Sequence, residues 1–191
     1  VLLTSSAMQG EGKTTVAIAL GASFAGAGFR VSLMDFDFVG RGMTRELGAD
    51  AEPGLADALE GGARDVAAVR THARGLELVP AGKRDEEHAH RLTVDALRPV
   101  VEAARLRSDV VILDTGPIMG SLKVGLLAQL CDAFIVVAAR GTPAPLVNAA
   151  IQRARESSSG RIAMIFNRAF PQDASTSASL SSLRSRQELN D

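Results

Sequence analysis

The 191 residues contain no tryptophan and no tyrosine, so phenylalanine alone supplies the aromatic fraction of 4%. The single cysteine, Cys131, has no second cysteine to pair with, which excludes an intrachain disulfide and favours a reducing compartment. The 21 lysines and arginines are balanced by 22 acidic residues. This balance gives no sign of a polyanionic partner, so we expect no binding to nucleic acid.

A long apolar run is also lacking. The longest uncharged stretch, 14–29, is interrupted by three glycines and a serine, and it is shorter than the roughly 20 residues of a membrane span. We expect it to be a buried helix. No positively charged segment precedes an apolar block, as it would in a secretory signal peptide. The chain opens at Val1, already within an apolar run, and we expect it to be part of a longer protein.

What the sequence does contain is an alternation of short apolar runs with longer helical patterns. Strand-length apolar runs cover 1–4, 31–34, 76–79, 110–113, 134–138 and 162–166. Helical patterns start at 14, where apolar residues recur every four positions, and cover 94–107, 124–130 and 146–156. Strands that are apolar on both faces and separated by helices predict an α/β fold with three layers, in which helices cover both faces of a mostly parallel sheet.

The composition divides the chain near residue 170. Residues 1–170 have the length and pattern of one domain, whereas 171–191 are rich in serine and poor in apolar residues. We expect this second segment to be a flexible tail. The alternative is an amphipathic terminal helix that would use Leu180, Leu183 and Leu189.

A glycine-rich segment, Gly-Glu-Gly-Lys-Thr-Thr at 10–15, follows the first strand and opens the first helix. This context is typical of a phosphate loop, in which backbone N–H groups and the helix N-terminus surround an anion. Lys13 would reach the β- and γ-phosphates, the Thr14 hydroxyl would bind Mg²⁺, and Thr15 would bind a phosphate further back. The first glycine of the standard pattern is replaced by Ala7. The nucleotide-binding residues expected here are Gln9, Gly10, Glu11, Gly12, Lys13, Thr14 and Thr15.

Two of the predicted strands end in carboxylates. Asp114 closes the strand at 110–113, as in a Walker B element, and would hold Mg²⁺ through a water molecule. Asp35 and Asp37 end the second strand, and their spacing predicts that both side chains face the same site. One would contact the metal while the other orients or deprotonates the attacking group. The alternative for all three is strand-end capping, since carboxylates also serve that purpose.

These elements together resemble the bacterial tyrosine autokinases, the cytoplasmic ATP-binding domains attached to polysaccharide co-polymerases. The resemblance rests on 4–15, on Asp35-Phe36-Asp37 and on Leu113-Asp114-Thr115-Gly116-Pro117, with further agreement at 53–61 and 78–82. It covers roughly residues 1–167. The nearest rivals are the chromosome-partitioning and division-site-positioning ATPases, whose loop carries an extra lysine where this chain has Met8.

The resemblance implies a P-loop domain that binds ATP and Mg²⁺ and controls exopolysaccharide or capsule synthesis. Asn167 would correspond to the asparagine that contacts the adenine, although a loop-capping asparagine is the alternative. The implied partners are ATP or ADP, a membrane co-polymerase segment or subunit and further copies of the chain, at the cytoplasmic face of the plasma membrane. The residues implied in catalysis are Lys13, Asp35, Asp37 and Asp114, and those implied in metal binding are Thr14, Asp35 and Asp114.

Several departures from the family pattern bear on activity. Gln9 replaces a proline of the loop, Val39 stands where an arginine is common, with Arg41 as a substitute, and 120–123 lacks a frequent aspartate. The tyrosine-rich tail of the family is replaced by a serine-rich one. We therefore expect either phosphorylation of another chain or ATP binding without phosphotransfer, as in a regulatory module.

Overall fold

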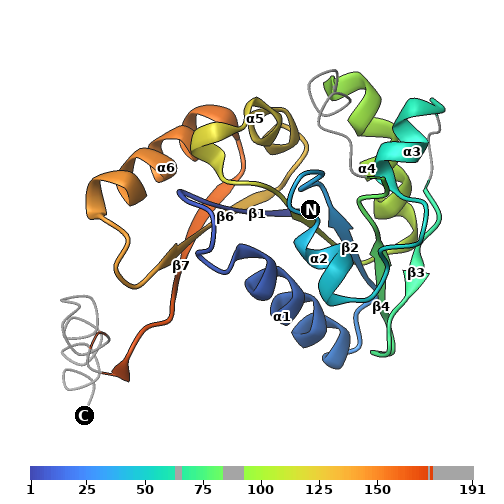
Figure 1. The fold of residues 1–191 in the computed structure, drawn as a ribbon, viewed down its shortest axis with the longest axis horizontal. Helices are drawn as coiled ribbons and strands as arrows, with labels where there is room; N and C mark the ends of the chain where they lie inside the picture. Colours follow the sequence, from blue (N-terminus) through green and yellow to red (C-terminus); the bar gives the residue numbers. More distant parts are fainter. Residues whose placement is uncertain (63–65, 84–92, 172, 174–191) are drawn as a thin grey trace, which may run out of the picture.

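In the computed structural model, residues 1–62, 66–83, 93–171 and 173 are described. They form one seven-stranded sheet with the order β3-β4-β2-β5-β1-β6-β7 (Figure 1). Neighbouring strands are parallel except β3, which runs antiparallel to β4. The strands are β1 (Leu2–Ser6), β2 (Val31–Asp35), β3 (Val69–Arg70), β4 (Leu76–Val79), β5 (Val110–Asp114), β6 (Ala133–Ala139) and β7 (Arg161–Asn167). The predicted α/β fold with a mostly parallel sheet is confirmed.

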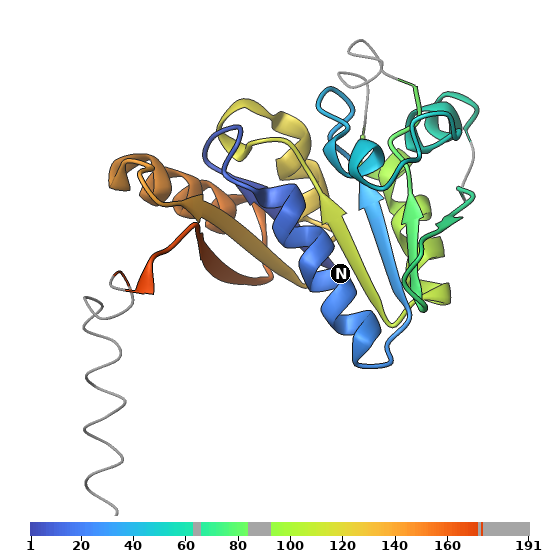
Figure 2. The same cartoon turned by 60° about the horizontal axis from the view of Figure 1, so that its bottom comes forward.

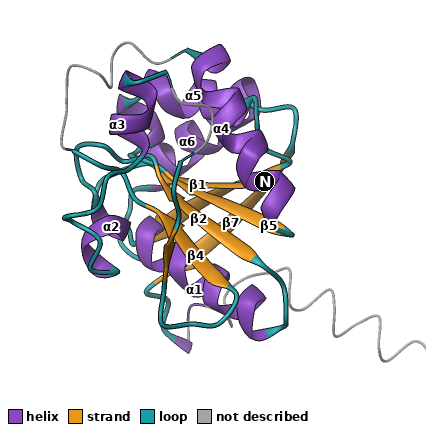
Figure 3. Ribbon diagram, turned by 90° about the vertical axis from the view of Figure 1, so that its right-hand side faces the viewer, coloured by secondary structure: helices purple, strands orange, loops and turns teal. Residues whose placement is uncertain are grey.

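Helices cover both faces of this sheet. Figure 3 shows α1 on one face and α3, α4, α5 and α6 on the other, with the strands between them. The helices are α1 (Lys13–Gly26), α2 (Gly42–Glu46), α3 (Leu55–Glu60), α4 (Val94–Arg107), α5 (Leu122–Ala128) and α6 (Ala144–Ser157), with a 3-10 turn η2 (Ile118–Gly120). The arrangement has the three layers that the alternation of apolar runs and helical patterns predicts.

Helix α1 lies unusually close to the sheet because its contact face is made of small residues. Ala17 and Gly21 are buried in the middle of the helix. A Cβ atom added to Gly21 would lie 2.8 Å from the Leu33 side chain, so a larger residue there would force that side chain to move. Figure 2 shows α1 in front of the central strands. The close packing fixes the start of α1, and with it the loop before the helix, against the carboxyl ends of the strands.

The opposite face of the sheet buries the larger core. Helix α4 is amphipathic and contributes Leu97, Val100, Val101 and Ala104 to this core, all with at most 1% of their surface exposed. Helices α5 and α6 pack on the same face, against β1 and β6 respectively. At roughly 1.5–3 kcal/mol for each large buried apolar side chain, this core holds the central strands in place.

Strand β7 differs from the expectation that every strand is buried on both faces. It lies at the edge of the sheet and is largely exposed, with Met164 at 53% and Phe166 at 46%. Helix α6 covers one of its faces, whereas α1 packs against the centre of the sheet (Figure 1). The prediction of a doubly covered strand is wrong here because the apolar run alone does not reveal a position at the edge.

The sequence patterns did not predict α2, α3, η2 or β3, which are too short to show a period. The predicted boundary at residue 170 remains a prediction, because nearly all of 171–191 lies outside the described residues. Among the described helices, none has the length and apolarity that crossing a bilayer requires.

Candidate functional site

The loop between β1 and α1 has the backbone shape of an anion-binding nest. Gly10 and Gly12 have φ values of 84° and 88°, a conformation that favours glycine. A Cβ atom on Gly12 would also lie 2.2 Å from Nδ2 of Asn167, so a side chain there is excluded by space as well. Lys13 begins α1, which places the free N–H groups of the first helical turn at the loop. Ala7, which replaces the first glycine of the standard pattern, is buried at the end of β1 and has no positive φ.

Glu11 connects this loop to the segment between β6 and α6. Its carboxylate is buried, and it accepts hydrogen bonds from the backbone N–H of Met8 at 2.6 Å, the N–H of Ala139 at 3.3 Å and the Thr142 hydroxyl at 2.6 Å. Met8 belongs to the loop itself, whereas Ala139 ends β6 and Thr142 precedes α6. The loop is therefore held in shape without a ligand. The sequence predicts Glu11 as a nucleotide-binding residue, and in the structure its side chain braces the loop by binding Met8, Ala139 and Thr142.

We expect Glu11→Ala to lower the free energy of unfolding by about 2–3 kcal/mol, because the buried N–H of Ala139 and the partly buried hydroxyl of Thr142 would lose a charged acceptor. Nucleotide affinity should fall about tenfold, since binding would then have to order the loop. Urea unfolding followed by circular dichroism measures the first effect, and titration with a fluorescent ATP analogue measures the second. The exposed Glu52→Ala serves as a control. Equal losses in both variants would contradict the role of the brace.

Lys13 and Asp37 face each other across the mouth of the loop. Their side chains are 9% and 16% exposed, and Nζ of Lys13 lies 3.5 Å from Oδ2 of Asp37. The other oxygen of Asp37 accepts a hydrogen bond of 2.9 Å from the N–H of Gly40. Both residues thus lie where the sequence predicts them, at the carboxyl end of the sheet and beside the loop.

Asp114 is a strongly perturbed carboxyl group of the site. Its side chain is fully buried, Oδ1 lies 3.4 Å from the Thr4 hydroxyl, and Oδ2 has no hydrogen-bond partner in the part of the chain that the structure describes. Burial and, to a smaller extent, the charge of Asp35 raise its pKa, the Thr14 hydroxyl and Lys13 act in the opposite direction, and the resulting pKa is about 7. A buried carboxylate with one unused oxygen beside a threonine hydroxyl is suited to a hydrated cation.

The position of Asp35 departs from the prediction that it faces the site together with Asp37. Its side chain is fully buried beside Asp114, its register partner on β5. Oδ2 accepts hydrogen bonds from the N–H and the hydroxyl of Thr44, at 2.8 and 2.7 Å, and Oδ1 accepts one from the N–H of Asp37 at 3.1 Å. Burial raises its pKa. Asp35 therefore anchors α2 to β2, with both of its oxygens already accepting hydrogen bonds, and metal binding by Asp35 stays a prediction.

Thr44 was not singled out by the sequence, yet it connects three segments. Its hydroxyl donates to Asp35 and accepts a hydrogen bond of 2.9 Å from the N–H of Ala81. These partners are nine and 37 residues away. A threonine in a short helix carries no local signal of such a role, so sequence patterns could not have found it.

Asn167 ends β7 and contacts the loop instead of an open base site. Its Nδ2 donates to the carbonyl oxygen of Glu11 at 2.9 Å, and its Oδ1 accepts from the N–H of Arg168, which has a φ of 59°. Arg168 in turn donates to the carbonyl oxygen of Gly10 at 2.8 Å. This geometry agrees with the loop-capping alternative, whereas contact with an adenine remains a prediction. Arg168 had no signal in the sequence.

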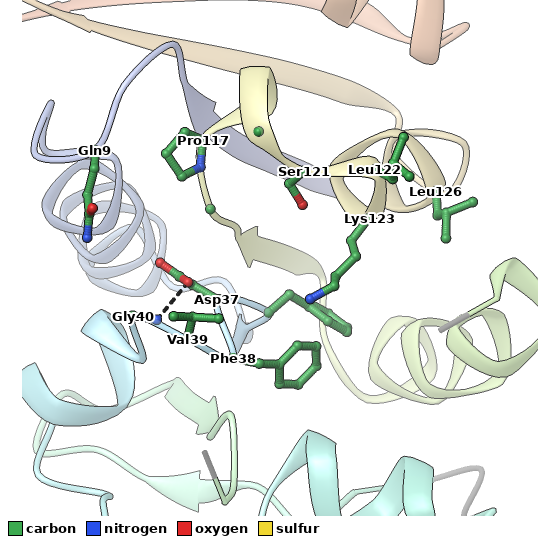
Figure 4. Close-up of a pocket in the computed structure, with 13 residues that line it drawn as sticks. Gln9, Asp37, Phe38, Val39, Gly40, Pro117, Ser121, Leu122, Lys123 and Leu126 are labelled. Atoms are coloured by element: carbon green, nitrogen blue, oxygen red, sulfur yellow. Dashed lines mark hydrogen bonds between the residues drawn. The ribbon is translucent and has the colours of Figure 1, made fainter. Parts of the chain in front are cut away.

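Beside the loop lies an open pocket with a volume of about 790 Å³. Figure 4 shows Gln9 and Asp37 on one side of it and Lys123, Leu122 and Leu126 of α5 on the other. Of the predicted nucleotide-binding residues, Gln9 lines this pocket, and Thr15 is exposed on the first turn of α1. The structure thus brings Gln9, Lys13, Thr14, Asp37 and Asp114 to one end of the sheet.

Comparison with known proteins agrees with this geometry. The sequence is 32% identical over 144 residues to the tyrosine-protein kinase CpsD of Streptococcus agalactiae, in a match that covers 74% of this chain. It is 29% identical over 152 residues to the succinoglycan biosynthesis transport protein ExoP of Rhizobium meliloti. The chain is a homologue of the bacterial tyrosine kinases. The resemblance stated from the motifs is therefore confirmed. No protein-family model matches the chain.

The tyrosine-kinase homologues are longer than this chain. The match spans 62% of the length of CpsD from Streptococcus agalactiae. The match to ExoP covers 77% of this chain but only 19% of ExoP. Among solved structures, the kinase domain of the Escherichia coli tyrosine kinase ETK superposes with a TM-score of 0.76 at 24% identity, covering 88% of this chain and 69% of that domain. The MinD cell division protein of Aquifex aeolicus gives 0.74 at 20% identity, covering 91% and 71%. Both show the shared fold, and the positioning ATPases match only at that level.

Proposed function

We propose that this domain binds Mg-ATP at the loop 10–15 and transfers the γ-phosphoryl group to a tyrosine outside these 191 residues. The observation that carries the proposal is the loop itself, braced by Glu11, with Lys13 paired to Asp37 beside it and Oδ2 of Asp114 without a hydrogen-bond partner among the described residues. The identity of 32% to a tyrosine-protein kinase supports tyrosine as the acceptor. Because these residues include no tyrosine, the acceptor belongs to another segment or another protein.

The residues at the base of the loop fit a magnesium ion. Thr14 would bind it through its hydroxyl, and Asp114 would hold one of its water molecules through Oδ2. Mg²⁺ retains several waters and needs few protein ligands. When bound, the ion neutralises charge on the β- and γ-phosphate oxygens.

The chain's own residues then divide the work of phosphoryl transfer. Lys13 would move from Asp37 to the phosphate oxygens and balance the charge that develops on them. Asp37, which is then free of the ammonium, would accept the proton of the attacking hydroxyl. The oxygen of that hydroxyl forms a bond to the γ-phosphorus while the bond to the oxygen bridging the β- and γ-phosphorus breaks, and ADP leaves. Asp35 and Thr44 keep the backbone of Asp37 in place.

The setting that we propose is the control of capsule or exopolysaccharide synthesis at the inner face of the plasma membrane. The relatives that support this setting include the tyrosine-protein kinase CpsD and the succinoglycan biosynthesis transport protein ExoP. We infer a membrane co-polymerase, or a segment of one, as the partner that brings the tyrosine acceptor. Assembly with further copies of the chain is part of the same proposal.

Incubation with γ-labelled ATP and a tyrosine peptide tests the transfer. We expect label on the peptide tyrosine, none with a phenylalanine peptide, and none when magnesium is removed with EDTA. Tight nucleotide binding without label on any acceptor would instead identify a regulatory module. Release of labelled phosphate that depends on lipid and on dimer formation would identify a positioning ATPase. Either result would replace the kinase proposal.

A further inference from the structure

The pocket beside the loop contains a cation that the proposed transfer does not use. Lys123 extends from α5 across the pocket toward Phe38, and its Nζ lies 5.8 Å from the centroid of that ring (Figure 4). It has no ion pair in the described part of the chain, and burial lowers its pKa. Asp37, already paired with Lys13, acts only through its charge at longer range. The ammonium of Lys123 is therefore partly desolvated without a close carboxylate.

The rest of the pocket offers apolar walls of a size that suits a peptide. The rings of Phe36 and Phe38 meet edge to face at 6.0 Å and form a buried floor of the pocket, with only 4% and 3% of the two residues exposed. Pro117, Leu122 and Leu126 line the other walls, and Leu122 is 82% exposed at the rim. The volume of about 790 Å³ exceeds what one phenol ring fills, so flanking residues of a bound segment would enter too.

We propose that this pocket, lined by Phe36, Phe38, Lys123 and Leu126, receives the acceptor segment and that Lys123 selects segments with carboxylates beside the tyrosine. The inference rests on the proposed function and adds the substrate class. The phenol ring enters the pocket between Pro117 and Leu126 with its hydroxyl toward Asp37, and a neighbouring glutamate or aspartate pairs with Lys123. A carboxylate brought to a half-buried ammonium restores the interactions that the ammonium lost with water, which makes the pairing selective.

Peptide binding tests this selectivity without requiring catalysis. The probes are fluorescein-labelled peptides with one tyrosine flanked on each side by two glutamates, two alanines or two lysines, measured by anisotropy with and without Mg and a non-hydrolysable ATP analogue. We expect the unaltered protein to bind the glutamate peptide at least tenfold more tightly than the lysine peptide. Lys123→Ala should remove the preference, and Lys123→Glu should reverse it. Lys83→Glu, at a lysine with 86% exposure, is the control of equal charge and should keep the original order.

Two further measurements separate the possible failures. Affinity for the ATP analogue, determined on the same proteins, tests the proposed function by itself. Equal binding of all three peptides by the unaltered protein overturns the selectivity, and so does an unchanged order in Lys123→Glu. A loss of nucleotide affinity in Lys123→Ala, together with unchanged peptide binding, would place the ammonium on the phosphates and also overturn it. Replacing the peptide tyrosine with alanine should weaken binding at least fivefold, and no loss would remove the aromatic part of the proposal.

Discussion

Lys13→Ala is expected to reduce ATP affinity by on the order of 100-fold while the fold persists, because a charged contact to phosphate contributes about 3 kcal/mol. The side chain begins α1 and lies 9% exposed at the mouth of the loop, where its only described ion pair is with Asp37. Asp37 keeps its hydrogen bond from Gly40 in the variant, and its partial exposure gives it access to water. We therefore expect the free energy of unfolding to change by no more than about 1 kcal/mol.

Calorimetric titration with Mg-ATP and urea unfolding by circular dichroism measure the two quantities for Lys13→Ala. Lys83→Ala, which removes an exposed lysine from another part of the fold, is the matched control and should bind ATP like the unaltered protein. ATP affinity within threefold of the unaltered protein in Lys13→Ala would remove the basis for the loop as a nucleotide site. A collapse of the circular dichroism spectrum would instead show that Lys13 is needed for folding.

Asp114→Asn is expected to change how stability depends on pH. The pKa of Asp114 is raised from 3.8 to about 7 in the folded protein, so folding favours the protonated carboxyl. Stability from this group is complete below pH 4 and is lost as the pH rises through 7. A difference of roughly three pKa units corresponds to about 4 kcal/mol at most. The variant should therefore be more stable than the unaltered protein at pH 8 and nearly equal to it at pH 4.

Urea unfolding between pH 4 and 8, without magnesium, checks this expectation. Some slope will remain in the variant because burial also raises the pKa of Asp35. Asp109→Asn is the control with the opposite sign, since Arg30 holds the pKa of Asp109 at about 2 and its contribution is lost only in stronger acid. Asp114→Asn should also weaken the magnesium requirement of ATP binding more than the binding of ATP in EDTA. Identical pH profiles and identical magnesium titrations would refute both roles of this carboxylate.

The features that the sequence predicted well are those written in local patterns. The longer strands and the long helices follow from the spacing of apolar residues, and the loop at 10–15 follows from its closely spaced glycines. Both patterns can be recognised within a short stretch of sequence. Helix α4, at Val94–Arg107, has the bounds that its apolar pattern predicts. Lys13, Asp37 and Asp114 lie together because the carboxyl ends of parallel strands share one edge of the sheet.

The features that escaped prediction depend on contacts between distant residues. The alternation of side chains along a strand predicts Asp35 and Asp37 on the same side. It cannot show that the N–H and hydroxyl of Thr44 both donate hydrogen bonds to the carboxylate of Asp35. The brace made by Glu11 joins residues more than 125 positions apart, and its partners at 139 and 142 have no pattern of their own. The exposure of β7 follows from the strand order, which an apolar run does not specify.

The ion pair between Lys13 and Asp37 has a consequence for the order of events at the site. In the structure the ammonium of Lys13 and the carboxylate of Asp37 pair with each other. Neither group is then free to act on an anion or on a hydroxyl group. Only a strong anion can draw the lysine away, and its arrival is what uncovers the carboxylate. In the transfer that we propose, the proton acceptor would therefore become available only after the phosphate donor is bound.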